Sequence, residues 1–107
     1  MTETKLHQTA AGLDVDTVLR AAAVLKAIGH PQRLRIVECL EEGDLSVKEL
    51  QSELDLPQAI VSQQLAILKG RGVVTSRRDG ALVYYSLVYT FPCRILDCIR
   101  ACRGEIT

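Results

Sequence analysis

The sequence predicts a mainly α-helical fold with one small β-hairpin, in a single domain of 107 residues. Three observations predict it. Apolar residues recur at three- and four-residue spacing in four stretches between residues 13 and 71. Two β-rich runs around an Asp-Gly pair follow, and the helical spacing then returns from residue 93 to about residue 103. Disorder is excluded, because 48% of the chain is hydrophobic and its 13 basic and 13 acidic residues cancel.

The helical part begins after a polar segment without periodicity, residues 1–12, which we expect to be a flexible arm. The first helix is predicted over residues 13–28, with Asp14 as its N-cap. The second is predicted to begin at Pro31, because proline is favoured at the first helical position, and to run to about residue 42.

Two further helices are predicted with a short turn between them. Ser46 and Glu49 have the spacing of a capping box, in which each side chain bonds the free backbone amide at the other position. This box opens a helix over residues 47–54, and Pro57 opens a longer one that runs to about residue 71. Two short helices joined by such a turn are typical of a helix-turn-helix.

The spacing changes from helical to extended after Gly72. The pair Asp79-Gly80 lies between two β-rich runs and is a strong hairpin signal, because the tight turn needs a positive φ at both central residues. A hairpin that follows a helix-turn-helix is a wing. We therefore expect residues 13–107 to form one winged helix-turn-helix domain.

Charge is unevenly distributed along the neutral chain. Residues 1–55 carry six basic and ten acidic side chains, a net charge of −4, whereas residues 56–107 carry seven and three, a net charge of +4. Such asymmetry favours a nucleic-acid partner for the C-terminal half.

Membrane and secretory classes are not expected. No apolar run approaches the roughly 18 residues of a membrane span, and the N-terminus lacks a charged-then-apolar signal pattern. We expect a cytoplasmic protein without a membrane partner. Thiols stay reduced in that compartment, so the four cysteines are not expected to form a disulfide framework.

The order of predicted elements resembles that of the ArsR/SmtB family of winged-helix repressors, from about Val18 to Leu96. The resemblance rests on LKAIGHPQRLRI at 25–36, LSVKEL at 45–50, VSQQLAIL at 61–68, and RRDG followed by YYSL at 77–87. It implies a homodimeric repressor that binds double-stranded operator DNA and releases it when an inducer binds. No nucleophile elbow, phosphate loop or metalloprotease spacing is present, so an enzyme is not expected.

The helix over residues 57–71 is predicted to read the DNA. Amide side chains pair with adenine edges in the major groove, and serine contacts bases or phosphates. Cations at the end of this helix and on the wing suit phosphates or the minor groove. The predicted DNA-binding residues are Gln58, Ser62, Gln63, Gln64, Lys69, Arg71, Arg77 and Arg78. The alternative is a solvated helix face and a hairpin tip charged for solubility, in a winged-helix protein-interaction module without a DNA role.

A dimer is expected because one recognition helix reads only a few base pairs, so repressors of this shape bind two half-sites about one helical turn apart. The first and last helices carry apolar residues beyond those one small domain needs. We expect these two helices to form the two-fold interface, as the resemblance also implies.

The resemblance leaves the inducer open. The family's arsenic site uses a cysteine-rich stretch near the third helix, but residues 42–46 here read Glu-Gly-Asp-Leu-Ser. The family's zinc site uses Asp and His on the last helix, and the last helix here has no histidine. Both sites are therefore doubtful in this chain.

The last helix instead carries Cys93, Cys98 and Cys102, which we predict to bind a thiophilic inducer. Residues four apart stack on one helix face with Cβ atoms about 6 Å apart, which suits Cys98 and Cys102. Cys93 lies about 140° around the helix from Cys98, so it joins only through an irregular start or in the partner chain's site. Thiolates without nearby His or carboxylate favour thiophilic ions such as trivalent arsenic or antimony, or cadmium, mercury and lead. Arg94 and Arg100 are expected to lower the thiol pKa values.

Other uses of the thiols stay open. Cysteine is often buried as a small hydrophobe. A branch of the family senses oxidants or reactive sulfur through a cysteine in the second helix and one near the end of the last, and Cys39 and Cys102 resemble that pair in general location only. Cys39 lies one residue after the position that the motif of this branch gives its cysteine, which rotates the side chain by about 100° around the helix. An iron–sulfur cluster, or Cys39 as a third sulfur ligand, is a further alternative.

Overall fold

The computed structural model describes residues 12–107. The expected flexible arm, residues 1–12, lies outside the described residues except for its last position. The elements, in chain order, are α2 (Val15–Ile28), α3 (Pro31–Leu40), β1 (Leu45–Ser46), α4 (Val47–Leu54), α5 (Gln58–Gly70), β2 (Val74–Asp79), β3 (Leu82–Leu87), α6 (Phe91–Ala101) and α7 (Arg103–Ile106). The predicted winged helix-turn-helix order is confirmed.

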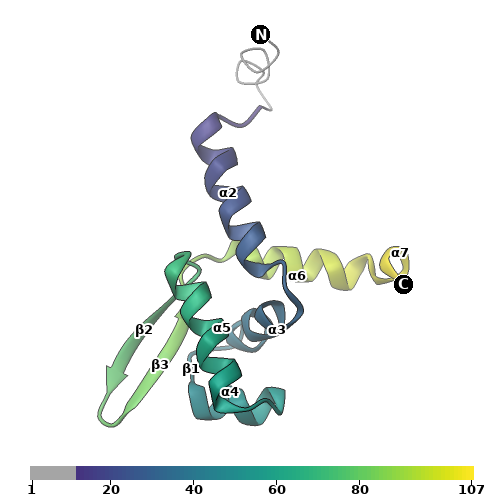
Figure 1. The fold of residues 1–107 in the computed structure, drawn as a ribbon. Coiled ribbons are helices and arrows are strands. Elements are labelled where there is room, and N and C mark those ends of the chain that lie inside the picture. Colours follow the sequence, from purple (N-terminus) through teal and green to yellow (C-terminus); the bar gives the residue numbers. More distant parts are fainter. Residues whose placement is uncertain (1–11) are drawn as a thin grey trace.

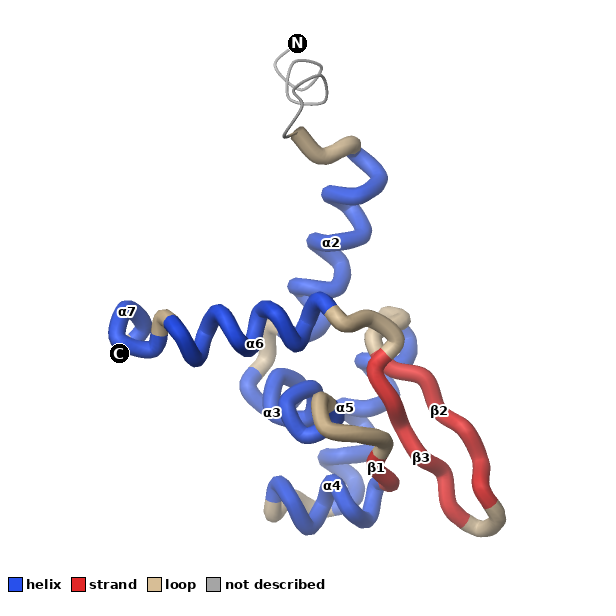
Figure 2. Tube along the Cα trace, turned by 180° about the vertical axis from the view of Figure 1, so that it is seen from behind, coloured by secondary structure: helices blue, strands red, loops and turns tan. Residues whose placement is uncertain are grey.

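Helices α3, α4 and α5 form a central cluster, and the β2–β3 hairpin extends from one side of it (Figure 1). Helix α2 projects away from this cluster, and α6 runs outward in another direction and carries α7 at its end (Figures 1 and 2). The extents of 53 × 34 × 21 Å reflect these two projecting arms. No helix within residues 12–107 is long and apolar enough to cross a membrane.

Side-chain caps begin the first three helices. Asp14 accepts a hydrogen bond from the Thr17 amide at the start of α2, at 3.1 Å. His30 caps α3 through Nδ1, which accepts from the Gln32 amide at 3.1 Å. The predicted capping box of Ser46 and Glu49 is present at the start of α4. Each cap satisfies a backbone donor that has no partner within its helix.

The wing is part of a three-stranded antiparallel sheet with the order β1-β3-β2. Sequence reasoning missed β1, whose two residues pair with Tyr84 and Tyr85 of β3. The pairing of Asp79 with Leu82 makes Gly80 and Ala81 the central residues of the turn. Gly80 has φ 67°, and Ala81 is not among the positive-φ residues. The expected turn with two positive φ values is therefore wrong, and glycine at the first central position is typical of a type II′ turn.

The core lies between the helical cluster and the base of the hairpin. Its buried hydrophobic residues are Val24, Ala27, Ile28, Ile36, Val37, Leu40, Leu50, Val61, Leu65, Leu68, Val73, Val74 and Leu96. Only the C-terminal half of α2 contributes to it. Leu13, Val15, Val18 and Leu19, at and before the start of α2 and along its first turns, stay 47–64% exposed. One chain by itself therefore leaves much of α2 uncovered.

Candidate nucleic-acid interface and thiol cluster

Helix α5 has one buried side and one exposed side. Val61, Leu65 and Leu68 are fully buried against the core. Because a helix turns about 100° per residue, Ser62 and Gln63 point away from this buried side. Gln58 and Gln63 are exposed and Ser62 is half-buried. We call these three residues the α5 face; their amide and hydroxyl groups can hydrogen-bond base edges or phosphates.

Gln64 does not belong to the α5 face. Its side chain is only 8% exposed. Its Oε1 accepts from an Arg33 guanidinium nitrogen at 3.0 Å, and its Nε2 donates to Gln32 Oε1 at 3.3 Å. The expectation that Gln64 lies on the exposed side is therefore wrong. Helical spacing could have found this, because Val61, Gln64, Leu65 and Leu68 follow the i, i+3, i+4, i+7 pattern of one helix face. The polar character of glutamine hid the signal.

Two of the predicted cations lie where α5 gives way to the wing. Lys69 is exposed in the last turn of α5, and its Nζ donates to the Ser76 hydroxyl of β2 at 2.7 Å. Arg71 is exposed just after the helix and makes no ion pair within residues 12–107. The contact between Lys69 and Ser76 joins the helix end to the wing, so the positive charges of both form one region.

The two arginines of the wing differ in their surroundings. Arg77 lies 3.1 Å from Asp44 and 5.0 Å from the centre of the Tyr84 ring. Arg78 is exposed and has no ion pair within the described part of the chain. Successive residues of a strand point to opposite faces of a sheet. Arg78 is therefore available to an anion, whereas Arg77 is held by its own chain.

Cys98 and Cys102 form a dithiol at the end of α6. The Cys102 amide donates to the Cys98 carbonyl at 2.9 Å, which keeps the helical spacing to the last turn. The charge of the Cys98 thiolate, together with a side-chain hydrogen bond to it, raises the pKa of Cys102, and Glu105 adds to this effect. Cys98 is exposed and Cys102 half-buried, so the pair is accessible to a small ligand.

Cys93 lies at the other end of α6 and has different neighbours. Burial raises its pKa most, and Glu41 and Asp97 raise it further. Within residues 12–107 no three Cys, His, Asp or Glu side chains are placed to hold one metal ion. One chain therefore does not bring the three predicted cysteine ligands together. The expectation that the thiols lie away from carboxylates is also wrong.

Arg100 lowers the pKa of Cys93, as expected, but burial and the nearby carboxylates outweigh this effect. Its guanidinium lies 2.6 Å from Glu41, 2.9 Å from Asp97 and 3.6 Å from Glu38. The hydrogen bond to Glu41, and after it the bond to Asp97, raise the pKa of Arg100, so its charge is largely shared with these carboxylates. The pKa values of Cys93 and Cys102 are raised, not lowered as predicted from the nearby arginines.

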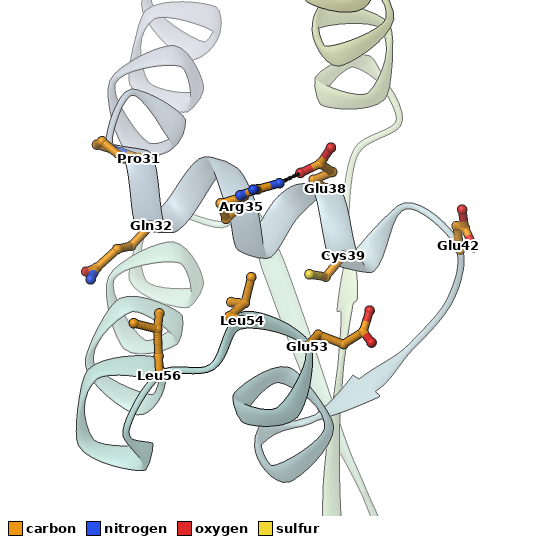
Figure 3. Close-up of a pocket in the computed structure, with 9 residues that line it drawn as sticks. All are labelled: Pro31, Gln32, Arg35, Glu38, Cys39, Glu42, Glu53, Leu54 and Leu56. Carbon is orange, nitrogen blue, oxygen red and sulfur yellow. Dashed lines mark hydrogen bonds and ion pairs between the residues drawn. The ribbon is translucent and has the colours of Figure 1, made fainter.

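Cys39 lines a pocket between α3 and α4 together with Leu54, Glu53 and the Arg35–Glu38 pair (Figure 3). Its side chain points toward α4, whereas Glu38 points toward α6 (Figure 3). Burial raises the pKa of Cys39, and Glu53 adds to this. The structure therefore does not turn Cys39 toward the last helix, where Cys102 lies.

The three-stranded sheet and the preceding pair of helices define a winged helix-turn-helix protein. Residues 30–76 match the pattern of the bacterial regulatory protein, arsR family. The chain is 36% identical over 80 residues to the biofilm growth-associated repressor of Agrobacterium fabrum. These 80 residues are 75% of this chain and 68% of that protein. The chain belongs to the ArsR family of bacterial transcriptional regulators, as its sequence predicts.

Solved structures agree with this assignment. Reduced HlyU from Vibrio cholerae superimposes with a TM-score of 0.72 at 34% identity, over 80% of this chain and 90% of that one. The homodimeric winged helix-turn-helix DNA-binding domain of a Mycobacterium bovis protein has a TM-score of 0.71 at 26% identity, over 91% and 92%. The likeness extends over most of the described chain.

Proposed function

We propose that this chain is a homodimeric repressor that binds double-stranded operator DNA. The observation that carries the proposal is the α5 face, together with the exposed cations Lys69 and Arg71 at the end of α5 and Arg78 on the wing. Polar groups on a helix that fits the major groove read base edges, while flanking cations bind phosphates. The relatives support it, since one is named a repressor and another is described as a DNA-binding domain.

A second copy of the chain supplies the other half-site. The exposed apolar residues of α2 offer an apolar surface that one chain does not cover. Burial of such residues stabilises a dimer by about 25 cal/mol per Å² of apolar area removed from water. The Mycobacterium bovis domain is described as homodimeric, which supports the same assembly here.

Selection of duplexes from a random library, followed by fluorescence anisotropy at several salt concentrations, tests DNA binding. We expect a duplex with two-fold symmetry whose affinity falls steeply with salt, because bound cations release counterions from DNA. The Gln63→Ala variant should lose base discrimination and keep its salt dependence. Recovery of no preferred duplex, or binding that ignores salt, would contradict the proposal.

We further propose that the inducer is a thiophilic ion, trivalent arsenic or antimony, bound by Cys98 and Cys102. Two sulfurs one helical turn apart match the soft-ligand preference of these ions. A third sulfur ligand cannot come from Cys93 of the same chain, because Cys93 lies at the other end of α6 from Cys98 and Cys102. Cys93 of the partner subunit would supply it if the last helices meet in the dimer.

Such an ion acts by binding one dimer shape more tightly than the other. Ligation across α6 would change the spacing of the two α5 faces and so release the operator. Anisotropy of the bound duplex, titrated with arsenite, antimonite, cadmium, zinc and a persulfide donor under anaerobic reducing conditions, identifies the inducer class. Release by arsenite that persists in the Cys98→Ser and Cys102→Ser variants would refute this site; Cys39→Ser is the matched control.

The second candidate is thiol redox or persulfide sensing. The adjacency of Cys98 and Cys102 favours it, because two accessible neighbouring thiols can be oxidised together. Its Cys39–Cys102 form has less support, because Cys39 points toward α4 (Figure 3). Release of DNA by the persulfide donor but not by arsenite would favour this candidate.

A further inference from the structure

Gln64 uses both ends of its amide inside the protein. The oxygen accepts from Arg33 and the nitrogen donates to Gln32, both residues of α3. Its burial to 8% exposure excludes water as a substitute partner for most of the group. A buried polar group that loses its partner costs more than one that exchanges it for water. The amide therefore favours a single placement of α5 against α3.

Arg33 extends this contact to a third helix. Its Nε donates to the carbonyl of Ala27, near the C-terminal end of α2. Within residues 12–107 Arg33 makes no ion pair with a carboxylate, and its guanidinium donates to two neutral oxygens. One of these two is the Gln64 oxygen. We call Gln32, Arg33 and Gln64, with the Ala27 carbonyl, the α2–α3–α5 bridge.

The bridge lies directly behind the α5 face. Adjacent residues of a helix point about 100° apart, so the rotation that places Gln64 against Arg33 also turns Gln63 outward. Leu65 and Leu68 bury the same helix, but apolar contacts are non-directional and tolerate small rotations. Hydrogen bonds weaken steeply when their geometry changes. The bridge is thus the directional part of the contact between α5 and the rest of the protein.

We infer that Gln64 is a positioning residue, which sets the rotation of α5 so that the α5 face meets base edges, and that it does not itself contact DNA. The inference rests on the proposed DNA-binding function. The bridge also connects α5 to the proposed dimer interface, because Arg33 donates to the end of α2, and we assign the exposed apolar residues of α2 to that interface.

The experiment compares the affinity of each variant for the selected operator with its affinity for a random duplex of equal length. A residue with a merely structural role would lower the thermal midpoint and leave this ratio unchanged in the folded protein. Gln64→Met keeps a side chain of similar length without the hydrogen bonds. We expect it to lower the ratio about tenfold, the discrimination of one base contact, with circular dichroism showing a folded protein.

Two further variants separate positioning from direct reading. Gln64→Glu keeps an oxygen for Arg33, and the Gln32 amide can turn to donate to it, so we expect a ratio within about threefold of wild type. Gln32→Ala removes one partner from a half-buried site and should lower the ratio by about threefold even if Gln64→Met fails to fold.

Each result decides a different question. If folded Gln64→Met and Gln32→Ala both keep the wild-type ratio of operator affinity to random-duplex affinity, the inference is overturned. A Gln64→Glu variant that is worse than Gln64→Met also overturns it, because a carboxylate placed directly on DNA would be repelled and Gln64 would then be a reading residue. Absence of any preferred duplex with wild-type protein instead overturns the proposed function and leaves the contact between α3 and α5 as a structural one.

Discussion

Replacement of Arg78 by alanine should lower the salt dependence of DNA binding by a calculable amount. Arg78 is exposed and has no ion pair within residues 12–107, whereas the neighbouring Arg77 is held by Asp44 at 3.1 Å. A homodimer carries two copies of Arg78, and each phosphate contact contributes about 0.9 to the slope of log K against log salt. Loss of both contacts should reduce the slope by about 1.8.

The same relation sets the loss of affinity. At about 0.1 M salt, a slope change of about 1.8 corresponds to a roughly 60-fold weaker complex, if counterion release dominates both contacts. Fluorescence anisotropy of a labelled operator duplex at four or more salt concentrations measures the slope directly. Arg77→Ala is the matched control, because its charge is already shared with a carboxylate and its removal should change the slope less.

Two outcomes would refute the reasoning. An Arg78→Ala slope equal to that of wild type would show that the free guanidinium does not meet a phosphate. A larger effect from Arg77→Ala than from Arg78→Ala would show that DNA recruits Arg77 away from Asp44, so the ion pair in the free protein would not predict the contacts of the complex.

Three other changes have defined outcomes. Asp44→Asn removes the closer carboxylate partner of Arg77 and leaves its 3.9 Å pair with Asp79, so Arg77 becomes more available to a phosphate. The salt slope should rise by up to about 1.8 for a dimer, and an unchanged slope in the same titration would contradict this. Ser46→Ala removes half of the capping box and should lower the free energy of unfolding by about 1 kcal/mol, measured by urea denaturation; a loss below a few tenths would show that the cap contributes little. Cys102 has a raised pKa, largely because of the Cys98 thiolate, so its thiolate forms at higher pH than in an ordinary thiol. Cys98→Ser should therefore move the midpoint of Cys102 alkylation against pH downward, and an upward or absent shift would contradict the coupling.

Local sequence signals predicted the helices and the wing well. The Ser46–Glu49 box and Pro31 mark helix starts through contacts within one turn of the chain, and the structure has them where predicted. The hairpin turn was placed but its geometry was not, because Asp79 pairs with Leu82 and leaves only Gly80 with a positive φ. Strand β1 was missed, because two residues have no periodicity and are extended only through pairing with β3.

The site residues divide in the same way. Gln58, Gln63, Lys69, Arg71 and Arg78 lie exposed, as the apolar spacing of α5 and the position of the wing predict. Their contact with DNA stays a prediction, as does the interface of the first and last helices.

The sequence by itself determined the order of the longer helices and the wing, the caps of α2 and α4, and the family, because each depends on contacts close along the chain or on motifs read directly. Only the tertiary structure decided which polar groups are already occupied. Gln64 is buried against α3, Arg77 is held by Asp44, and Arg100 is held by Glu41 and its neighbours. These partners lie 31, 33 and 59 residues apart in the chain, and helical or strand spacing carries no information about contacts at such separations.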